Sequence, residues 1–301
     1  WNLEDKNNIF YSAAEDINIV FKKIKPSCVL VTGGTDFGIY KDFFPVKNKR
    51  MMIPLDPSQL AAFKSRMASN CNSDPAEEIQ SDEIESYAIG LNSHGSGFSC
   101  WPFVTQAFRH IDRRIAKWYS TNMSVHEDVF QGIPLGTNPS TKELVVKYRD
   151  TLKDKLLYMN FRHEREDGYE LHSEIAHDFR IETWNRYKDR DWVTVESKVS
   201  EDQYCSNLAR HKFALSPEGN GVDTYRTWEC LYLGVIPIVQ KSEVTAWFSD
   251  LPILELTEDE WKNLDAGFLG RKYEEMKSKT YNMEKLDKRF WINRIEDGVY
   301  V

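Results

Sequence analysis

One short stretch of the chain concentrates residue types that bind charged ligands. It runs "SPEGNGVDTYRTWE" over residues 216–229 and follows a run of apolar β-formers. Gly219 and Gly221 let the backbone approach a ligand closely, because neither carries a Cβ. Arg226 suits phosphate oxygens as a forked donor, and Glu229, on the same helix face, suits the hydroxyls of a ribose. The pattern predicts a phosphate-bearing ligand at a helix start; the alternative is that Arg226 and Glu229 only pair with each other.

The second half of the chain supplies the elements that would position these residues. Short β-rich runs ("LLYMNF", "WVTVE", "FALS", "VIPIV", "ILEL") alternate with helical spacing within 169–180, across 200–210 and after Gly221. This alternation predicts a parallel, doubly wound sheet, which binds ligands beyond the carboxyl ends of its strands. "FALS" ends at Ser216, so the glycine turn lies at that edge. Arg162 follows "LLYMNF" at the same edge, although a solvated arginine is an equally good interpretation.

The first half has a less regular pattern. "CVLVT" at 28–32 predicts a buried parallel strand that ends in a turn at Gly33 and Gly34, and "VFQGIPLG" predicts extended chain. Helical spacing is found over 9–23 and 105–120. A further helix is expected in "PSTKELVVKYRDTLKDK", with a capping box of Ser140 and Glu143, and "KLDKRFWINRI" predicts a last amphipathic helix. After Gly34 the next glycine is Gly38, so the Gly-x-Gly-x-x-Gly dinucleotide fingerprint is missing.

Composition bounds the class of protein. The chain has 301 residues and a net charge of -8, which suggests two domains and argues against non-specific binding to nucleic acid or anionic membrane. No apolar run reaches the length of a membrane span. Five cysteines without a Cys-x-x-Cys pair give no support for zinc, and Cys230 fits a core position. We expect a reducing, cytoplasmic compartment rather than the Golgi lumen; the start at Trp1 leaves a removed signal or anchor open.

A family resemblance rests on residues 216–239. "SPEGNGVDTYRTWECLYLGVIPIV" resembles the C-terminal motif of exostosin-type glycosyltransferases, which are glycosyltransferase family 47 and its relatives. "DKLLYMNFR" and "AKWYSTNMSVHEDVFQGIPLG" are weaker similarities. One departure is Glu218, where many exostosins have arginine. The shared features are a Gly-x-Gly turn, a hydroxyl residue, Arg-x-x-Glu and Gly-x-Ile-Pro, here Gly219, Gly221, Thr224, Arg226, Glu229, Gly234, Ile236 and Pro237.

The resemblance implies an α/β protein of the GT-B fold, in which two Rossmann-like domains face each other across a cleft. We expect an acceptor-binding domain over 1–148, a nucleotide-sugar-binding domain over 149–275 and a C-terminal helix within 276–301 that returns to the first domain. It also implies that Glu229 holds the donor ribose and Arg226 the diphosphate. The expected donor-binding residues are Arg162, Ser216, Glu218, Gly219, Asn220, Gly221, Asp223, Thr224, Tyr225, Arg226 and Glu229.

Catalysis by such an enzyme needs a general base for the acceptor hydroxyl. Asp36, in the turn after "CVLVT", is the first candidate, and a turn-forming aspartate is the alternative interpretation. His94 in "NSHGSG" is the second candidate, and His126 with Glu127 the third. The Asp-x-Asp run at 189–191 precedes "WVTVE" at the amino end of a strand, so we expect a solvated turn there. We therefore expect no obligatory metal and no cofactor.

These observations lead to one functional expectation and two alternatives. We expect an inverting hexosyl- or pentosyltransferase that moves a sugar from a UDP-sugar to a glycan hydroxyl. Its partners would be the nucleotide-sugar donor and a glycan or glycoside acceptor, without nucleic acid. The first alternative is a GDP-sugar-dependent enzyme of the fucosyltransferase type with a GT-B fold. The second is a non-catalytic protein of the same fold that binds a glycan or a nucleotide.

Overall fold

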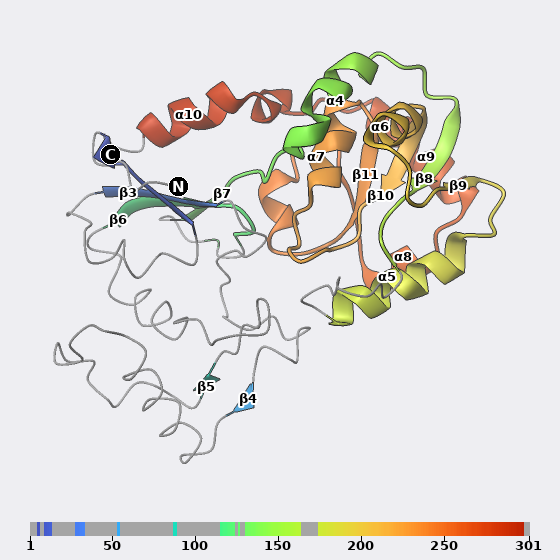
Figure 1. The fold of residues 1–301 in the computed structure, drawn as a ribbon, viewed down its shortest axis with the longest axis horizontal. Helices are drawn as coiled ribbons and strands as arrows, with labels where there is room; N and C mark the ends of the chain where they lie inside the picture. Colours follow the sequence, from blue (N-terminus) through green and yellow to red (C-terminus); the bar gives the residue numbers. More distant parts are fainter. Residues whose placement is uncertain are drawn as a thin grey trace.

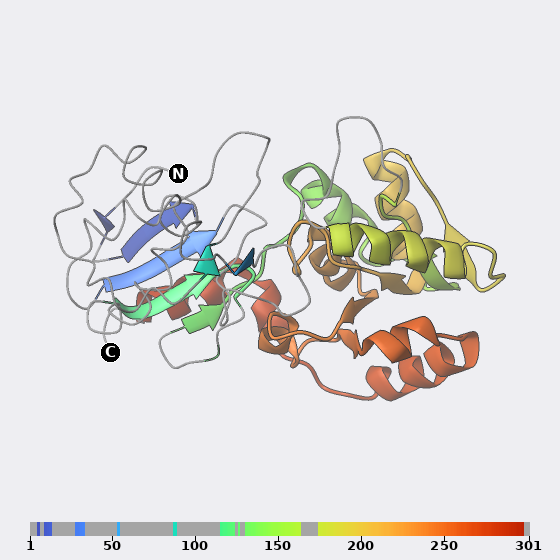
Figure 2. The same ribbon diagram turned by 90° about the horizontal axis from the view of Figure 1, so that it is seen from below.

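Two five-stranded sheets form the framework of the chain. The computed structural model describes residues 5–6, 9–13, 28–33, 53–54, 87–88, 115–123, 126, 130–163 and 174–297. Figures 1 and 2 show the two sheets in separate parts of the molecule, with most of the described helices around the second. The architecture is mixed α/β with parallel strands and is compatible with a Rossmann-like fold.

The second sheet is entirely parallel and confirms the predicted alternation of strands and helices. Its spatial order is β12-β11-β10-β8-β9. If the five strands are numbered 1 to 5 along the chain, their order from the β9 edge is 2-1-3-4-5. Each of the five β-rich runs overlaps one of these strands. Their bounds are β8 (Lys155–Met159), β9 (Val193–Val195), β10 (His211–Leu215), β11 (Ile236–Gln240) and β12 (Leu254–Leu256).

Helices cover both faces of this sheet, because its strands are apolar on both sides. Tyr158 and Ala214 belong to one core layer, whereas Leu157 and Phe213 belong to the other. Cys230 is fully buried in the first layer, as predicted. That layer contains α4 (Lys142–Tyr148), α6 (Glu201–Ala209) and α7 (Tyr225–Tyr232); the opposite layer contains α5 (Glu174–Tyr187), α8 (Glu258–Lys262) and α9 (Ala266–Lys277).

The first sheet has the order β1-β2-β3-β6-β7, and only β1 pairs antiparallel to its neighbour. The strand predicted from "CVLVT" and the extended chain predicted at "VFQGIPLG" are both confirmed. A separate antiparallel pair joins β4 to β5. The bounds are β1 (Asp5–Lys6), β2 (Ile9–Ala13), β3 (Cys28–Gly33), β4 (Ile53–Pro54), β5 (Tyr87–Ala88), β6 (Ile115–Ser120) and β7 (Phe130–Gly132).

Two helix predictions in the first half are wrong where the structure describes them. Residues 9–13 and 115–120 are strands that flank β3 on its two sides. The first opens with Ile-Phe-Tyr, and β-forming residues that can join a ladder override a weak helical spacing. In the second, the consecutive Trp118 and Tyr119 are both buried, which is typical of a strand covered on both faces.

The helix predicted after residue 139 forms as α4, but its predicted capping box is wrong. A 3₁₀ turn, η2 (Pro139–Thr141), precedes the helix, so Thr141 is the N-cap and makes no capping hydrogen bond through its side chain. The Ser140 hydroxyl instead donates to the carboxylate of Glu201 on α6. Ser140 therefore ties two helices together and leaves the first turn of α4 without its cap.

The C-terminal residues form the predicted amphipathic helix, α10 (Lys288–Asp297), which contacts both parts of the molecule. Figure 1 shows α10 passing from the second sheet toward the first. The Tyr119 hydroxyl donates to the Arg294 carbonyl at 2.7 Å, and Ile295 packs with Tyr119. Trp291 packs with Trp228, beside η3 (Thr245–Phe248) and η4 (Met283–Leu286). The domain limits 1–148, 149–275 and 276–301 stay predictions.

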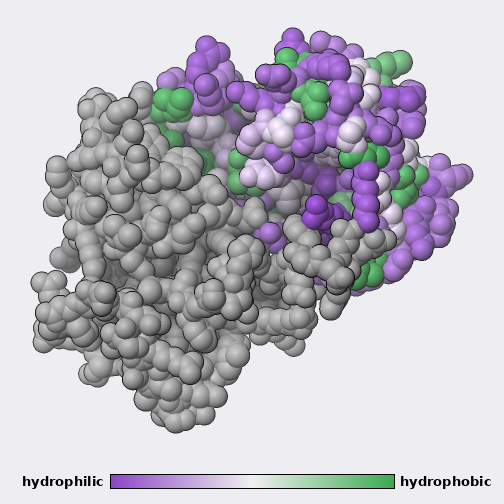
Figure 3. Space-filling model, viewed as in Figure 1, coloured by the Kyte–Doolittle hydropathy of each residue, from purple (hydrophilic) through white to green (hydrophobic). Residues whose placement is uncertain are grey.

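The described surface of the second half is mainly polar on the face drawn in Figure 3, where hydrophobic residues lie scattered between hydrophilic ones. Of the helices in the described ranges, none has both the length and the apolar character that crossing a membrane requires.

Candidate functional site

The strand order of the second sheet creates a switch point between β8 and β10. From β8 the chain continues through α5 to β9, whereas from β10 it continues through α7 to β11 on the other side. In such sheets a crevice opens beyond the carboxyl ends of these two strands, and ligands bind there. Tyr158 pairs with Ala214, so the parallel register continues to Asn160 and Ser216. Residues 160–163 and 216–221 therefore lie on the two sides of this switch point, and we call the region between them the crevice.

Arg180 on α5 holds both sides of the crevice in place. Its Nε donates to the Glu218 carbonyl at 2.7 Å, and its Nη1 donates to the Arg162 carbonyl at 3.3 Å. A Cβ on Gly219 would lie 3.1 Å from Arg180 Nη2. Gly219 thus makes room for this buried arginine, and the expectation that it also lets a ligand approach stays a prediction. The sequence prediction missed Arg180, because it belongs to no motif.

Hydroxyl groups connect the end of β10 to α7. Ser216 Oγ lies 2.9 Å from Thr224 Oγ1 and 3.0 Å from Thr227 Oγ1. Ser216 is buried, so its side chain fastens the glycine turn to the helix. Thr224 is the N-cap of α7 but makes no hydrogen bond from its side chain to the first-turn amides. The Thr227 N–H already donates to the Thr224 carbonyl at 3.1 Å, so the Tyr225 and Arg226 amides, at the positive end of the helix dipole, are the ones left for an anion.

Arg226, in the first turn of α7, carries its positive charge without a local partner. Its Nε is buried and lacks a hydrogen bond, and in the described part of the chain no ion pair joins its guanidinium to Glu229 or another carboxylate. The alternative that Arg226 and Glu229 only pair with each other is therefore not what the structure shows. A buried guanidinium nitrogen without a partner is costly, so a bound anion would stabilise it.

Glu229, one turn further along α7, is almost completely buried and already holds two hydroxyls. Its Oε1 accepts a hydrogen bond from Thr141 Oγ1 at 2.6 Å, and its Oε2 accepts one from the Tyr204 hydroxyl at 2.7 Å. These bonds join α7 to η2 and α6. Each carboxylate oxygen keeps a second lone pair, so the ribose contact stays a prediction.

Asp223 joins the glycine turn to the first half of the chain. Its backbone N–H donates to Asn122 Oδ1 at 2.7 Å, just beyond the carboxyl end of β6. Its carboxylate accepts from Leu135 N at 2.8 Å and from Trp228 Nε1 at 2.8 Å. Burial raises the pKa of Asp223 to about 7, although these donors oppose the change. Through Asp223 the carboxyl-end loops of the two sheets meet.

The remaining predicted site residues differ in exposure. Tyr225 and Arg162 are exposed, Glu218 and Asn220 are partly exposed, and Gly221 is buried. The proposed bases Asp36 and His94 lie outside the described residues, as does Glu127.

His126, a third-choice base, is described and occupied by protein contacts. Its ring stacks on Trp247 with centroids 4.2 Å apart, and Nε2–H donates to the Glu243 carbonyl at 2.6 Å.

The Asp-x-Asp run at 189–191 forms an exposed turn before β9, as predicted. It lies at the amino end of that strand, on the edge opposite the crevice. Among the described residues, no group of three or more His, Cys, Asp or Glu side chains is arranged to hold a metal ion. Independence from metal stays a prediction.

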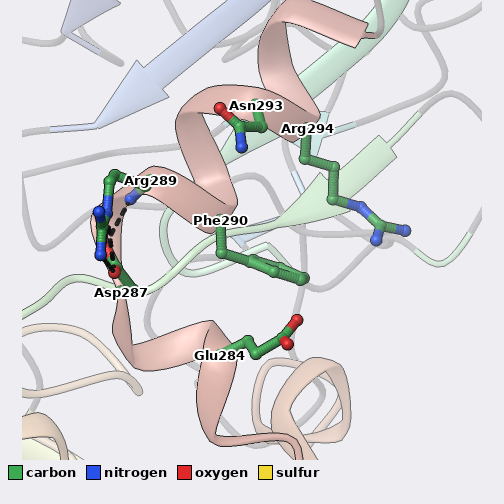
Figure 4. Close-up of a pocket in the computed structure, with 6 residues that line it drawn as sticks. All are labelled: Glu284, Asp287, Arg289, Phe290, Asn293 and Arg294. Atoms are coloured by element: carbon green, nitrogen blue, oxygen red, sulfur yellow. Dashed lines mark hydrogen bonds and ion pairs between the residues drawn. The ribbon is translucent and has the colours of Figure 1, made fainter.

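A separate open pocket of about 600 Å³ lies along η4 and α10. Figure 4 shows Phe290 in its middle with the Glu284 carboxylate near the ring, and Arg289 bonded to Asp287 at its side. None of the predicted site residues belongs to its described lining, which is formed by Glu284, Asp287, Arg289, Phe290, Asn293 and Arg294.

Comparison with known proteins supports a glycosyltransferase-related family. The family model described as the RXYLT1 C-terminal domain matches residues 164–249, which is less than a third of the chain. The match covers both β10 and α7 with the glycine turn between them, so it includes Arg226 and Glu229. No curated protein matches the chain. The geometry of the crevice and the family match thus indicate the same part of the molecule.

Proposed function

We propose that this chain is a glycosyltransferase that moves a sugar from a UDP-sugar to a glycan hydroxyl and inverts the anomeric carbon. A glycosyltransferase-type function has the support of the family match. The proposal of a nucleotide-diphosphate donor rests on Arg226, whose buried Nε has no hydrogen-bond partner among the described residues and which lies at the uncapped start of α7. The two features supply positive charge at a switch point, where a diphosphate fits.

The proposed chemistry is a direct displacement. The acceptor oxygen attacks the anomeric carbon from the side opposite the diphosphate, the bond from that carbon to the leaving oxygen breaks, and the base takes the hydroxyl proton. Negative charge grows on the diphosphate in the transition state, so preorganised donors stabilise it. We assign this role to Arg226 and the first-turn amides of α7, with Arg162 as a second cation and Glu229 on the ribose.

A GT-B arrangement is part of the proposal, and the contact between Asn122 and Asp223 supports it. Asn122 lies beyond the carboxyl end of β6, and β3 runs parallel beside β6. The chain therefore leaves β3 after Gly33 at the edge that meets the glycine turn. On this basis we keep Asp36 as the proposed general base and His94 as the second choice.

Donor hydrolysis tests the function directly. The protein is incubated with a panel of UDP-sugars and GDP-sugars without acceptor, and the released UDP or GDP is measured. Slow release of UDP is expected, because transferases lose some donor to water. Release of GDP alone would favour the fucosyltransferase-type alternative, and binding of UDP-sugar without any release would favour a binding protein.

The base is tested by substitution once an acceptor is known. Asp36→Asn should lower the transfer rate by about 10²–10⁴, the usual contribution of a general base. UDP affinity and melting temperature should stay unchanged, because the base acts on the acceptor. A rate loss accompanied by an equal loss of stability would mean that Asp36 only builds the turn, and near-normal transfer would make His94→Ala the next variant.

A further inference from the structure

A chain of hydrogen bonds runs from α6 to the mouth of the crevice. Asn207 Nδ2 donates to Glu196 Oε1 at 2.6 Å, and the Tyr158 hydroxyl donates to Glu196 Oε2 at 2.6 Å. Asn160 Nδ2 then donates to the Tyr158 hydroxyl oxygen at 3.2 Å. These four residues come from β8, from the residues just beyond β8 and β9, and from α6. None of them belongs to the site that the sequence predicts.

The direction of each bond in this chain follows from Glu196. Its carboxylate accepts both bonds, one from the Asn207 amide and one from the Tyr158 hydroxyl, so the single hydroxyl hydrogen of Tyr158 is used. Burial first, and then the bond to Glu196, raises the pKa of Tyr158 far above its usual value, so the hydroxyl keeps its proton. The remaining lone pairs of the Tyr158 oxygen can accept, and the only Asn160 group that can donate to them is the amide NH₂. The network therefore fixes which way the Asn160 amide is turned.

This orientation leaves the carbonyl oxygen, Oδ1, as the hydrogen-bond acceptor that Asn160 can offer a ligand, next to the second N–H of its amide. Asn160 is partly exposed, and among the described residues no hydrogen bond reaches its Oδ1. The residue is level with Ser216 across the switch point, and its amide lies on the Tyr158 side of the sheet, which α7 covers. The positive charge of Arg226 acts to lower the pKa of Tyr158, against the larger effect of burial. The site thus offers a hydrogen-bond acceptor on the same side of the sheet as the Arg226 cation.

The chemistry of a nucleotide diphosphate sugar decides what this acceptor would bind. The diphosphate oxygens carry no hydrogen to donate at neutral pH, and the proposed partner for them is Arg226. The groups on either side of a diphosphate are the ribose and the transferred sugar, and both carry hydroxyls that donate. An acceptor placed next to the diphosphate site therefore suits one of these hydroxyls.

We propose that Asn160 Oδ1 accepts a hydrogen bond from a hydroxyl of the nucleotide-sugar donor, and that Tyr158 and Glu196 are positioning residues that keep the amide turned toward it. This inference rests on the proposed function. It adds a contact on the β8 side of the crevice, opposite the glycine turn, and it gives the buried Tyr158–Glu196 pair a part in donor binding.

Calorimetry with UDP and with a UDP-sugar tests the contact. Asn160→Ala should weaken binding by about three- to tenfold, as expected for one neutral hydrogen bond. Equal losses for both ligands would assign the hydroxyl to the ribose, and a loss confined to the UDP-sugar would assign it to the transferred sugar. Unchanged affinity for both ligands in a folded Asn160→Ala protein would overturn the proposal.

A double-mutant cycle tests the positioning role, which a merely structural tyrosine would not show. Tyr158→Phe removes the hydroxyl that orients the amide and should weaken UDP-sugar binding by about two- to fivefold. In the Asn160→Ala background the same change should have no further effect, because no amide remains to be oriented. Equal losses in both backgrounds would show that Tyr158 acts through packing alone, and the positioning role would be rejected.

Tyr187→Phe provides the matched control. Tyr187 is a buried tyrosine whose hydroxyl donates to the Trp261 carbonyl in the layer on the opposite face of the sheet. Its loss should lower stability without changing UDP-sugar affinity. Binding by the wild-type protein distinguishes failure of the proposed function from failure of the Asn160 contact alone. If it binds neither UDP nor a UDP-sugar, both proposals fail; if it binds and Asn160→Ala binds equally well, only the Asn160 contact fails.

Discussion

The two faces of α7 differ in how their polar groups are satisfied. On the face toward α6, which we call the crevice face, Arg226 and Glu229 lie one above the other, and Arg226 lacks a partner among the described residues. On the face toward η3 and α10, which we call the junction face, Trp228 packs edge to face on Phe248 with centroids 4.9 Å apart. Its indole N–H is bonded to Asp223.

This difference separates a binding role from a joining role within one short helix. A face that only holds the protein together gains stability by satisfying its buried polar groups, as the bond between Trp228 and Asp223 does on the junction face. A face that receives a ligand must leave some groups open until the ligand arrives. Substitutions on the junction face should therefore change stability, whereas those at the open end of the crevice face should change affinity.

The largest effect is expected for Trp228→Ala on the junction face. The side chain is 1% exposed, and truncating a buried tryptophan costs about 3–5 kcal/mol of unfolding free energy. It also leaves the Asp223 carboxylate without the indole donor. Urea unfolding measures the loss. Trp228→Phe is the matched variant, which keeps an aromatic ring against Phe248 and should lose less. A cost below about 1 kcal/mol for Trp228→Ala would remove the distinction between the faces.

Asp223→Asn should change how stability depends on pH. Burial raises the pKa of Asp223 to about 7 in the folded protein, whereas an unfolded aspartate titrates near 3.9. Between these values the folded state holds a proton that the unfolded state has lost. The contribution of Asp223 is therefore most favourable below about pH 4 and falls by about 1.4 kcal/mol per pH unit up to pH 7.

The comparison with the asparagine variant isolates this group. His211 is also buried, and burial lowers its pKa to about 4, so its contribution to stability is lost as pH falls from about 6.5. Both proteins contain His211, so the difference between their unfolding free energies reports Asp223 alone. That difference should shift by up to about 4 kcal/mol between pH 4 and pH 7 in favour of the variant. Parallel curves would mean that Asp223 stays ionised in the junction.

Much of the second half could be predicted from sequence, because its strands are apolar runs bounded by clear turns. The five strands, the start of α7 and the exposed turn at 189–191 all follow from local patterns. Residues 9–13 and 115–120 could not be predicted in this way, because their strand state depends on pairing with β3. Local spacing carries no information about a partner strand that is distant in sequence.

Prediction of the candidate site from sequence has the same limit, because local patterns carry no information about contacts between distant segments. The glycine turn and its helix carry a motif, and they lie at the predicted edge of the sheet. Arg180, Tyr158 and Glu196 carry none, and their importance comes from contacts that only the fold creates. Gly219 illustrates this limit, because the side chain nearest to its missing Cβ belongs to an arginine 39 positions earlier in the chain.

On the crevice face, Arg226→Ala should lower UDP affinity by about ten- to hundredfold and leave the melting temperature nearly unchanged. A hydrogen bond between charged groups contributes about 1.5–3 kcal/mol, and among the described residues this guanidinium has no hydrogen-bond partner to lose. Calorimetry and a thermal melt make the measurement. Arg190→Ala, an exposed arginine at the opposite edge of the sheet, is the control and should bind UDP normally.

Glu229→Ala sharpens the same test, because its two hydroxyl partners are lost together with any ribose contact. Lower stability with unchanged UDP affinity would restrict Glu229 to a structural role. Normal UDP binding by folded Arg226→Ala would argue against a diphosphate at this face.

The smallest effect, no loss at all, is expected when divalent metal is removed. If Arg226, Arg162 and the amides of α7 supply the positive charge for the leaving diphosphate, a chelator takes nothing from the reaction. UDP release from a UDP-sugar should therefore proceed at the same rate in excess EDTA. Asp189→Ala should also be neutral, because its turn precedes β9 at the edge opposite the crevice. A rate that falls in EDTA and returns with manganese would show that a metal also stabilises the leaving diphosphate. A manganese titration of the rate of UDP release, carried out on the wild type and on Arg226→Ala, would then compare the two contributions, since the variant without the guanidinium should depend on manganese more steeply.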